Sequence, residues 1–489
     1  MPVIPVADWA PDAAALGNPA ALRVENVVPG PTGYKPFRRF SVGSNALDDY
    51  PRGAISALDD SLVTYTYAGD ESKLYSFASS TWSDASKAGG YSTGEKERWE
   101  FVRWKDKVLA TNFSDNPQCI TMGASNFADV TSAFKARHIA VVRDFVVMAN
   151  TTDGTDGEQI DRVRWSGFND ETSWAVSSIT GADVRSLNTG GQIQRVFGGE
   201  YGVILSENSA WRMSYTGAPT WFQIDEVLPG VGAVAPGAAA QHGDSVYFLS
   251  AHGFVRLVNG AQPTYIGAGR VDNTVLQDLD TNYLHRMSAE VDPEANRVIW
   301  AYPGQSSIGG APDTLVIYDW ALDRWSTVKV GVELIWRVSG VGLTLEQLDD
   351  LSASIDALDT SLDSTRFKGN TPNLGAFNSE FKSGFFSGAP MTAVIETKEV
   401  ELTPGSRTTA KAFRPLVDQG SVSGRVGVRA SQSYPVEWVD ASPLRPGGRM
   451  PVRASGRYHR FELTLNGEWT DVLGVSVDAA DARPSGRRG

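Results

Sequence analysis

Residues 242–267, HGDSVYFLSAHGFVRLVNGAQPTYIG, have the layout of three short strands joined by two turns. The apolar runs 246–249 and 254–258 are the first two strands, and Asn259-Gly260 follows them. This dipeptide favours a two-residue hairpin turn, because both central residues of a type I′ turn need φ > 0. A third strand then ends on an aromatic residue. One such meander buries too little surface to be stable alone, so we expect further copies along the chain.

Hairpins followed by an aromatic residue, after a turn rich in Ser, Thr or Asn, do recur along the chain. The closing aromatic residues are Trp82, Phe127, Trp174, Trp221, Tyr265 and Trp325. Their spacings are 45, 47, 47, 44 and 60 residues, and the last is long because 304–312 adds a Gly/Ser loop. Propeller blades repeat about every 40–50 residues. The spacing therefore predicts a β-propeller of six or seven blades; chance spacing in a two-sheet protein is the competing interpretation.

Composition limits the class of protein. The chain has 489 residues, 41% of them hydrophobic and 21% charged, which is typical of a globular protein with two or more domains. Its single cysteine excludes an internal disulfide framework. No apolar run reaches 18 residues, and the first residues lack a basic segment followed by an apolar one. We therefore expect no stable membrane insertion and no secretory signal.

The N-terminal segment, 1–48, is predicted to be an extended arm, because seven prolines interrupt it too often for a helix. We expect a strand over 22–28, and 37–46 could lie against the last blade and close the ring. Docking on a neighbour is favoured over a solvated tail by its apolar side chains, which are Trp9, Leu16, Leu22, Val24, Val27, Tyr34 and Phe37.

Residues 49–390 are predicted to form the propeller. The blades fall at about 53–90, 97–134, 138–185, 194–228, 236–268 and 287–330, with a seventh divided between 331–339 and 374–388. An insertion at 341–373 separates the two parts of the seventh blade. Within it, Thr344 to Gln347 fits a capping box, and Leu and Ile residues recur over 348–362 at intervals of three and four. This pattern predicts a short surface helix packed on a neighbouring surface.

Residues 391–489 have the strand pattern of a β-sandwich and should join the arm in one separate β-rich platform. Residues 401–489 carry 13 Lys/Arg against 9 Asp/Glu, a net charge of +4, whereas the first 400 residues carry −17. A partner interface could be formed by Arg425, Arg429, Arg449, Arg453, Arg457 and Arg460. Alternatively, these arginines point to solvent from one face of the sandwich, at alternate positions along its strands, and only increase solubility.

Candidate chemical groups are scattered, and we predict no catalytic, cofactor or metal site. The histidines, His138, His242, His252, His285 and His459, never have metal-ligand spacing. Cys119 has no general base beside it, and the acidic loop 153–158 misses the spacing of a calcium loop. The glycines at 230–237 only half resemble a dinucleotide loop, and no nucleophile elbow, P-loop or zinc pattern occurs.

Three parts of the sequence resemble tail nozzle proteins of short-tailed bacteriophages, also called packaged-DNA stabilisation or tail tube proteins. These parts are DWAPDAAALGNPAALRVENVVPGPTGYKPFRRF (8–40), TSLDSTRFKGNTPNLGAFNSEFKSGFFSG (360–388) with ETKEVELTPGSRTTAKAFRPLVD (396–418), and the ending from 455. The resemblance implies a virion protein of the phage tail, assembled in the host cytoplasm. It also implies a homo-hexameric ring below the portal and its adaptor protein, with one propeller per subunit around a channel for DNA. Tail fibres or tailspikes are further expected partners, and no catalytic or cofactor-binding residue is implied.

The charge agrees with a conduit. Six copies of a chain of net charge −13 sum to −78, so double-stranded DNA should pass through without specific binding. The main alternative is a glycan- or receptor-binding propeller of a phage tail, with aromatic residues lining pockets at the blade tops. A propeller hydrolase is a third possibility, and it would require carboxylates with perturbed pKa values converging at the axis.

Overall fold

The structure, a computed structural model, describes residues 3–13, 20–339 and 372–481. This part of the chain is all-β, as the sequence predicts, with strands β1 to β39. One short helix, α1 (Asp272–Asp278), and two 3-10 helices, η1 (Pro236–Ala238) and η2 (Thr281–Arg286), complete it. Over these ranges, no helix is long and apolar enough to cross a membrane. The helix predicted within 344–362 lies outside the described residues.

Five four-stranded antiparallel sheets follow one another in chain order. The first two consist of β6 (Gly53–Leu58), β7 (Thr64–Gly69), β8 (Leu74–Ala78) and β9 (Thr81–Asp84), and of β10 (Glu100–Trp104), β11 (Lys107–Thr111), β12 (Gln118–Thr121) and β13 (Ala128–Asp129). The third consists of β14 (Phe134–Val142), β15 (Phe145–Asp153), β16 (Gly157–Trp165) and β17 (Asp183–Ser186). The last two consist of β18 (Ile193–Phe197), β19 (Gly202–Ser206), β20 (Ser209–Gly217) and β21 (Trp221–Pro229), and of β22 (Ala239–His242), β23 (Ser245–Ser250), β24 (Gly253–Val258) and β25 (Gln262–Tyr265).

Two further arrays continue the series. One contains β26 (Ser288–Asp292), β27 (Arg297–Tyr302), β28 (Thr314–Asp319) and β29 (Arg324–Lys329), which begin a nine-stranded sheet. The other contains β30 (Leu334–Ser339), β31 (Pro372–Phe377) and β32 (Lys382–Phe385), and its fourth strand is β5 (Ser41–Ala46) from the start of the chain. The prediction that 37–46 lies against the last blade is thereby confirmed.

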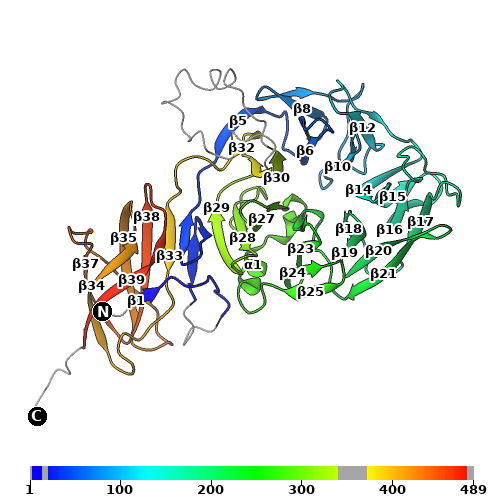
Figure 1. The fold of residues 1–489 in the computed structure, drawn as a ribbon. Helices are drawn as coiled ribbons and strands as arrows, with labels where there is room; N and C mark the ends of the chain where they lie inside the picture. Colours follow the sequence, from blue (N-terminus) through cyan, green and yellow to red (C-terminus); the bar gives the residue numbers. More distant parts are fainter. Residues whose placement is uncertain (1–2, 14–19, 340–371, 482–489) are drawn as a thin grey trace, which may run out of the picture.

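The first strands of these arrays contact one another in sequence. β6 contacts β10, β10 contacts β14, β14 contacts β18, and the 3-10 helix η1 links β18 to the sheet of β22. β22 then contacts β26, β26 contacts β30, and β30 contacts β6 again. Figure 1 shows the sheets following one another around a common centre, with β6, β10, β14, β18 and β30 on the inner side. These sheets resemble the blades of a β-propeller.

The stretch 242–267 has the predicted layout. β23 pairs with β24, and β24 pairs with β25. Asn259 and Gly260 have φ of 52° and 60°, which confirms the expected positive-φ hairpin turn. Five of the six periodic aromatic residues lie in or beside the fourth strand of their sheets, and Trp174 lies in the segment between β16 and β17. The sequence period therefore marks the outer edge of five of these arrays.

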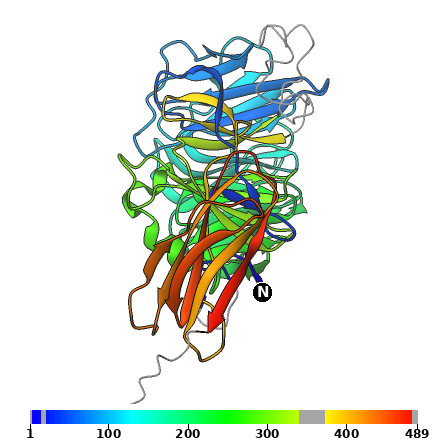
Figure 2. The same cartoon turned by 90° about the vertical axis from the view of Figure 1, so that its left-hand side faces the viewer.

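Both chain ends contribute to two sheets that pack together beside the propeller sheets, and we call these two sheets the platform. Its six-stranded sheet contains β1 (Val3–Pro5), β3 (Val27–Pro29), β4 (Tyr34–Pro36), β34 (Thr408–Val417), β37 (Met450–Gly456) and β39 (Val472–Asp481). Its other sheet contains β2 (Arg23–Glu25), β33 (Ala393–Glu396), β35 (Ser421–Arg429), β36 (Glu437–Asp440) and β38 (Tyr458–Asn466). The two sheets share buried side chains, including an edge-to-face contact between Phe413 and Phe461 at 5.6 Å. Figure 2 shows the platform in front of the propeller sheets.

Two predictions about the arm need correction. The strand expected over 22–28 is divided at Asn26, whose φ of 61° ends β2 and sends β3 into the other platform sheet. The platform is also not separate, because β2 pairs on one side with β29 and on the other with β33. One nine-stranded sheet therefore runs from the propeller into the platform, and backbone hydrogen bonding is continuous across the junction.

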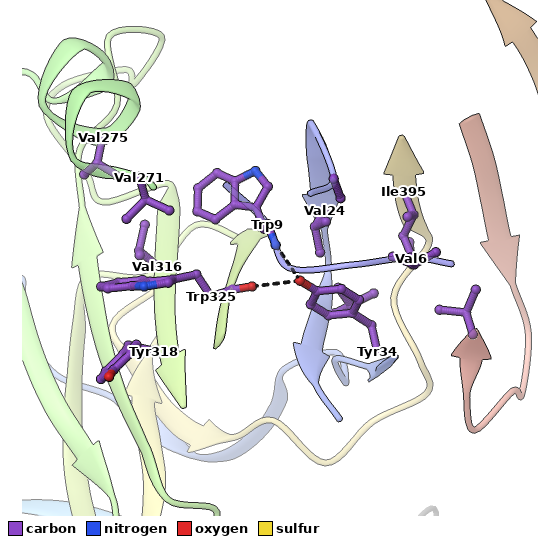
Figure 3. Close-up of a cluster of buried hydrophobic side chains, with 14 of the residues drawn as sticks. Val6, Trp9, Val24, Tyr34, Val271, Val275, Val316, Tyr318, Trp325 and Ile395 are labelled. Carbon is purple, nitrogen blue, oxygen red and sulfur yellow. Dashed lines mark hydrogen bonds between the residues drawn. The ribbon is translucent and has the colours of Figure 1, made fainter. Parts of the chain in front are cut away.

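The arm docks on its own chain. The main-chain N–H of Trp9 donates to the Tyr34 hydroxyl at 2.9 Å, and that hydroxyl donates to the Trp325 carbonyl at 3.1 Å (Figure 3). Trp9, Val24 and Tyr34 are buried in one cluster with Trp325 of β29 and Ile395 of β33. Their apolar surface is used within the subunit, so the expectation that the arm makes oligomer contacts loses its main argument.

Candidate functional site

Charged side chains gather where the first strands of the sheets converge. These strands are mostly apolar, yet each of four carries one charged residue directed to this region: Glu100 in β10, Arg195 in β18, Glu290 in β26 and Arg337 in β30. Arg98, just before β10, and His138 in β14 complete the set. We call these six residues the axial cluster. Because innermost strands of a ring meet at its centre, the cluster lies on the propeller axis.

Glu100 is the hub of the axial cluster. It is 3% exposed, and Arg195 Nη1 donates to its Oε1 at 2.6 Å. His138 Nδ1 lies 3.0 Å from the same oxygen, and the Ile139 N–H donates to Oε2 at 3.3 Å. The other ring nitrogen of His138 lies 2.9 Å from the Ile193 carbonyl oxygen. Three adjacent first strands, β10, β14 and β18, are thus joined through one carboxylate.

The two axial carboxylates are affected in opposite directions. Burial acts to raise the pKa of Glu100, but Arg195, His138 and Arg98 together outweigh burial and hold that pKa below its ordinary value. Burial raises the pKa of Glu290, and the charge of Arg337 offsets this only in part. Glu100 is therefore firmly ionised, whereas Glu290 takes up a proton more readily than an exposed glutamate.

Arg98 crosses the axis. It precedes β10, yet its Nη1 donates to the carbonyl of Met287, which precedes β26 on the opposite side of the ring. The guanidinium also lies against Gly237 in η1, where a Cβ would collide with it. Burial lowers the pKa of Arg98 to about 10, so the group remains charged at neutral pH. The side chain closes the centre of the ring at this level.

A cleft lies beside Arg98 at the mouth of the axis. It has a volume of about 20 Å³, room for about one water, and is lined by Tyr50, Pro51, Arg52, Glu97, Arg98, His285, Arg286, Glu333 and Leu334. Arg52 donates to the carbonyls of Thr93 and Gly94, and Arg286 pairs with Glu333. These residues lie where β6, β10, β26 and β30 begin, so the cleft opens at one end of the axis.

The predicted interface arginines lie in the platform, and most of them form ion pairs within it. Arg425 binds Glu462 through two hydrogen bonds of 2.8 Å, and Arg429 and Arg460 both pair with Glu399. Arg449 pairs with Asp478 at 3.1 Å, and Arg457 with Glu401 at 2.8 Å. Arg453 is exposed on β37, an edge strand. The six do not form one free basic surface, because five of their charges are matched locally.

The remaining candidate residues have structural environments. His459 is fully buried in the platform, and His242 stacks on Trp320 at 5.0 Å. Burial raises the pKa of Cys119 to about 11, which makes its thiolate scarce at neutral pH. Asp153 in the acidic loop pairs with Arg162 and Arg164, each at 3.2 Å. Within the described part of the chain, no group of three or more His, Cys, Asp or Glu is arranged to hold a metal ion.

Sequence reasoning missed the axial cluster, although one signal was available. Arg195 in IQRVF and Arg337 in LIWRVS are lone charged residues among mostly apolar ones, whereas EFVRW contains Arg103 besides Glu100. A charge in the first strand of a repeat points to the axis once the ring is known. Arg98 and Met287 are 189 residues apart, and no local pattern indicates that they meet.

The fold and the charged axis define the class of protein as an all-β protein of the β-propeller type. The chain is similar to BamB from Moraxella catarrhalis, at 11% identity and a TM-score of 0.36, covering 74% of this chain and 92% of that one. It is also similar to the Pan2 WD40 domain of Neurospora crassa, at 7% identity and a TM-score of 0.36, with 70% of this chain and 96% of that domain covered. These likenesses concern the general architecture, and no function follows from them. No family model and no curated protein matches the sequence.

Proposed function

We propose that this chain is a non-enzymatic structural protein of a short-tailed bacteriophage tail. It is a nozzle or tube subunit that forms a hexameric ring below the portal and its adaptor, retains packaged DNA and conducts it during ejection. Its propeller has seven blades, of which β5 completes the last, and its β-sandwich platform is built from both chain ends. The protein is assembled in the host cytoplasm, and tail fibres or tailspikes are further partners.

One observation carries this proposal. The stretches that resemble nozzle proteins are far apart in sequence, yet their strands are neighbours in the structure. β4, β39 and β34, from the stretches 8–40, 455 onward and 396–418, are adjacent in one sheet, and β2 and β38 flank β33 in the other. The stretch 360–388 instead forms β31 and β32 of the last propeller array. Three of the four stretches thus pack together, which favours a shared structural unit over scattered similarity. This supports a platform of the nozzle type.

The axis of a single propeller is unsuited to conduct DNA. Arg98 spans it, and Glu100, Arg195 and His138 are joined along one side of it. A DNA channel must therefore be enclosed by several copies of the chain, which is the arrangement in the proposed ring. The first 400 residues carry a net charge of −17, so a lumen that they line would repel phosphate.

Imaging of the purified protein and of virion tails by electron microscopy tests the proposal. The expected result is a six-fold ring with a central hole, together with no salt-sensitive retention of duplex DNA in a gel at low ionic strength. A monomer or trimer that binds glycans would overturn it in favour of the receptor-binding alternative. Tight binding of DNA by the native ring would overturn the conduit.

The platform interface needs a test with unpaired arginines. Reversing Arg425 or Arg457 would place a glutamate opposite Glu462 or Glu401, so loss of assembly would not separate interface from fold. Arg445 and Arg453 are exposed, and the double variant Arg445→Glu/Arg453→Glu should weaken ring or adaptor association while leaving the thermal melt in place. Arg185→Glu, on the outer strand β17, is the matched control. Unchanged assembly in the double variant would remove these residues from the interface.

The hydrolase alternative is favoured by one observation, the opposite pKa shifts of Glu100 and Glu290 at the axis. However, Glu100 is 3% exposed and is engaged by Arg195, His138 and a backbone N–H, and Arg98 closes the approach. We expect no turnover of ester, glycosidic or peptide substrates. Turnover that Glu290→Gln abolishes in a folded protein would contradict the structural role.

A further inference from the structure

A pocket away from the axis lies at the seam between the first two sheets of the ring. Its volume of about 550 Å³ is within the range of about 300–1,000 Å³ that small-molecule sites have. The β7–β8 turn, the end of β9, the segment between β9 and β10 and the loop between β12 and β13 form its walls. It is lined by Ser72, Lys73, Asp84, Ser86, Lys87, Gly89, Gly90, Tyr91 and Asn126.

The walls of this pocket are fixed by hydrogen bonds within the chain. The Tyr91 N–H donates to the Ser72 carbonyl at 3.0 Å, and the Tyr91 hydroxyl accepts from the Lys87 N–H at 3.2 Å. Across the seam, Asn126 Nδ2 donates to the Ser86 carbonyl at 2.8 Å. The pocket is therefore shaped before a ligand arrives, which lowers the cost of ordering on binding.

The charges of the pocket disfavour an anionic ligand. Lys73 Nζ lies 2.5 Å from Asp48 and 4.0 Å from Asp84, and Lys87 Nζ lies 2.7 Å from Asp129. Two cations thus face three carboxylates, and no positive charge is in excess. An apolar ligand is disfavoured as well, because every lining side chain carries a polar group that would lose its water without replacement.

Hydrogen-bonding capacity nevertheless remains in the pocket. An ammonium has three donors, and Lys73 uses one of them on Asp48. A carboxylate can accept about four hydrogen bonds, and Asp84, whose side chain is 51% exposed, accepts from the Ser86 N–H at 2.9 Å. Donors and acceptors therefore lie side by side in one open space. Hydroxyl groups suit this arrangement, because each of them both donates and accepts.

We propose that this pocket binds a neutral polyhydroxylated ligand, such as one unit of a saccharide chain. Hydroxyl groups of the ligand donate to Asp84 and accept from Lys73, and the exposed Ser72 and Asn126 bind neighbouring hydroxyls. The site differs from the aromatic blade-top pockets of the receptor-binding alternative. It does not depend on the proposed tail function, since it requires only that the first two sheets pack together.

Calorimetry and saturation-transfer NMR of the full chain with maltose, lactose and N-acetylglucosamine test this site. We expect at least one of these saccharides to bind saturably, with one site per chain. Its binding should be tighter than that of spermidine or sodium phosphate at equal ionic strength. Tighter binding of spermidine would identify a cation site and tighter binding of phosphate an anion site, and either result would overturn the proposal. The absence of saturable saccharide binding would overturn it too.

Asp84→Asn should weaken saccharide binding at least about tenfold, because a hydrogen bond to a charged group is lost. Asp60→Asn is the matched control and should leave the binding unchanged, since Asp60 is 92% exposed in the β6–β7 turn, at the opposite end of the same sheet. Because Asp84→Asn also alters the bond to Ser86, a second measurement uses the unmodified chain. The saccharide should slow hydrogen exchange of the amides over 85–91 and leave the exchange over 59–63 unaltered. Unchanged exchange over 85–91 at saturating saccharide would contradict the site.

Discussion

Individual polar groups connect parts of this chain that are distant in sequence. The Tyr34 hydroxyl accepts from the Trp9 N–H and donates to the Trp325 carbonyl, so it joins the arm, the platform and β29. Glu100 of β10 likewise connects three first strands at the axis, because it accepts a hydrogen bond from Arg195 of β18 and lies beside His138 of β14. Buried groups of this kind are costly to leave unpaired, which makes single substitutions informative.

Tyr34→Phe should lower the free energy of unfolding by about 1–3 kcal/mol, because the Trp9 N–H and the Trp325 carbonyl lose their partner in a buried site. Urea unfolding followed by tryptophan fluorescence measures the change. Tyr265→Phe is the matched control, since Tyr265 is 49% exposed, and its stability should be near that of the wild type. Equal stability of all three proteins would show that the junction does not depend on this hydroxyl.

Glu100→Gln should destabilise the protein by about 1–3 kcal/mol at neutral pH, because the partly buried Arg195 then loses its charged hydrogen-bond partner. The pKa of Glu100 is lowered in the folded state, so its contribution is present above its ordinary value of 4.5 and is lost as the pH falls through the folded value. The difference between wild type and variant should therefore shrink on acidification below 4.5.

Chemical unfolding at a series of pH values measures this effect. The control is Glu380→Gln, which removes a fully exposed partner of Lys382 and should change stability little at any pH. A difference between wild type and Glu100→Gln that stays constant down to about pH 3 would show that ionisation of Glu100 is not its cause.

At the scale of elements, the ring depends on one strand from the start of the chain. β5 completes the sheet of β30, β31 and β32, and its register pairs Val42 with Gly384. A Cβ at Gly384 would collide with the Ser41 carbonyl, whereas a Cβ at Gly43 would lie 3.7 Å from the Ser383 carbonyl. The two glycines face the same seam but differ in the space beside them.

Gly384→Ala should separate β5 from β32 and open the ring, whereas Gly43→Ala should preserve the pairing. Hydrogen exchange of the amides over 41–46 measures the seam directly. We expect much faster exchange in Gly384→Ala, together with earlier proteolysis in the arm. Similar exchange in the two variants would show that the seam adjusts to the added methyl group.

Across the whole molecule, the propeller and the platform are one continuous structure. The nine-stranded sheet passes from β29 through β2 to β33, and one buried cluster includes Trp325, Tyr34 and Phe413. Arg324 of β29 strengthens the junction, since it donates to the carbonyls of Gly30 and Gly33 and pairs with Asp8 at 2.6 Å. Relative motion of the two parts would break these contacts together.

We therefore expect calorimetry to show a single unfolding transition for propeller and platform, with equal calorimetric and van't Hoff enthalpies. Arg324→Met keeps the aliphatic stem but removes the donors, and it should split or broaden this transition. Arg185→Met provides a comparison at an exposed site and should unfold as the wild type does. Two resolved transitions in the wild type would contradict the continuous junction.

Local sequence alone determined the strands and turns of the repeating part. Asn259-Gly260, the apolar runs beside it and the aromatic period are local features, and they predicted both the hairpins and the positions of the outer strands. The place of 37–46 on the last blade also followed from the sequence, because a sheet with a free edge needs a partner.

Only the tertiary structure decided how the ends and the axis are arranged. Asn26 divides one predicted strand between two sheets, and β2 joins a platform that was expected to be separate. The arginines expected at an interface find carboxylates across neighbouring strands, as Arg425 finds Glu462. Arg98 meets Met287 from 189 residues away. Such contacts depend on the register between strands and on the closure of the whole ring. A local sequence pattern shows which side chains of a strand face the core, because buried and exposed side chains alternate along it. The pattern does not show which distant strand will pair with it.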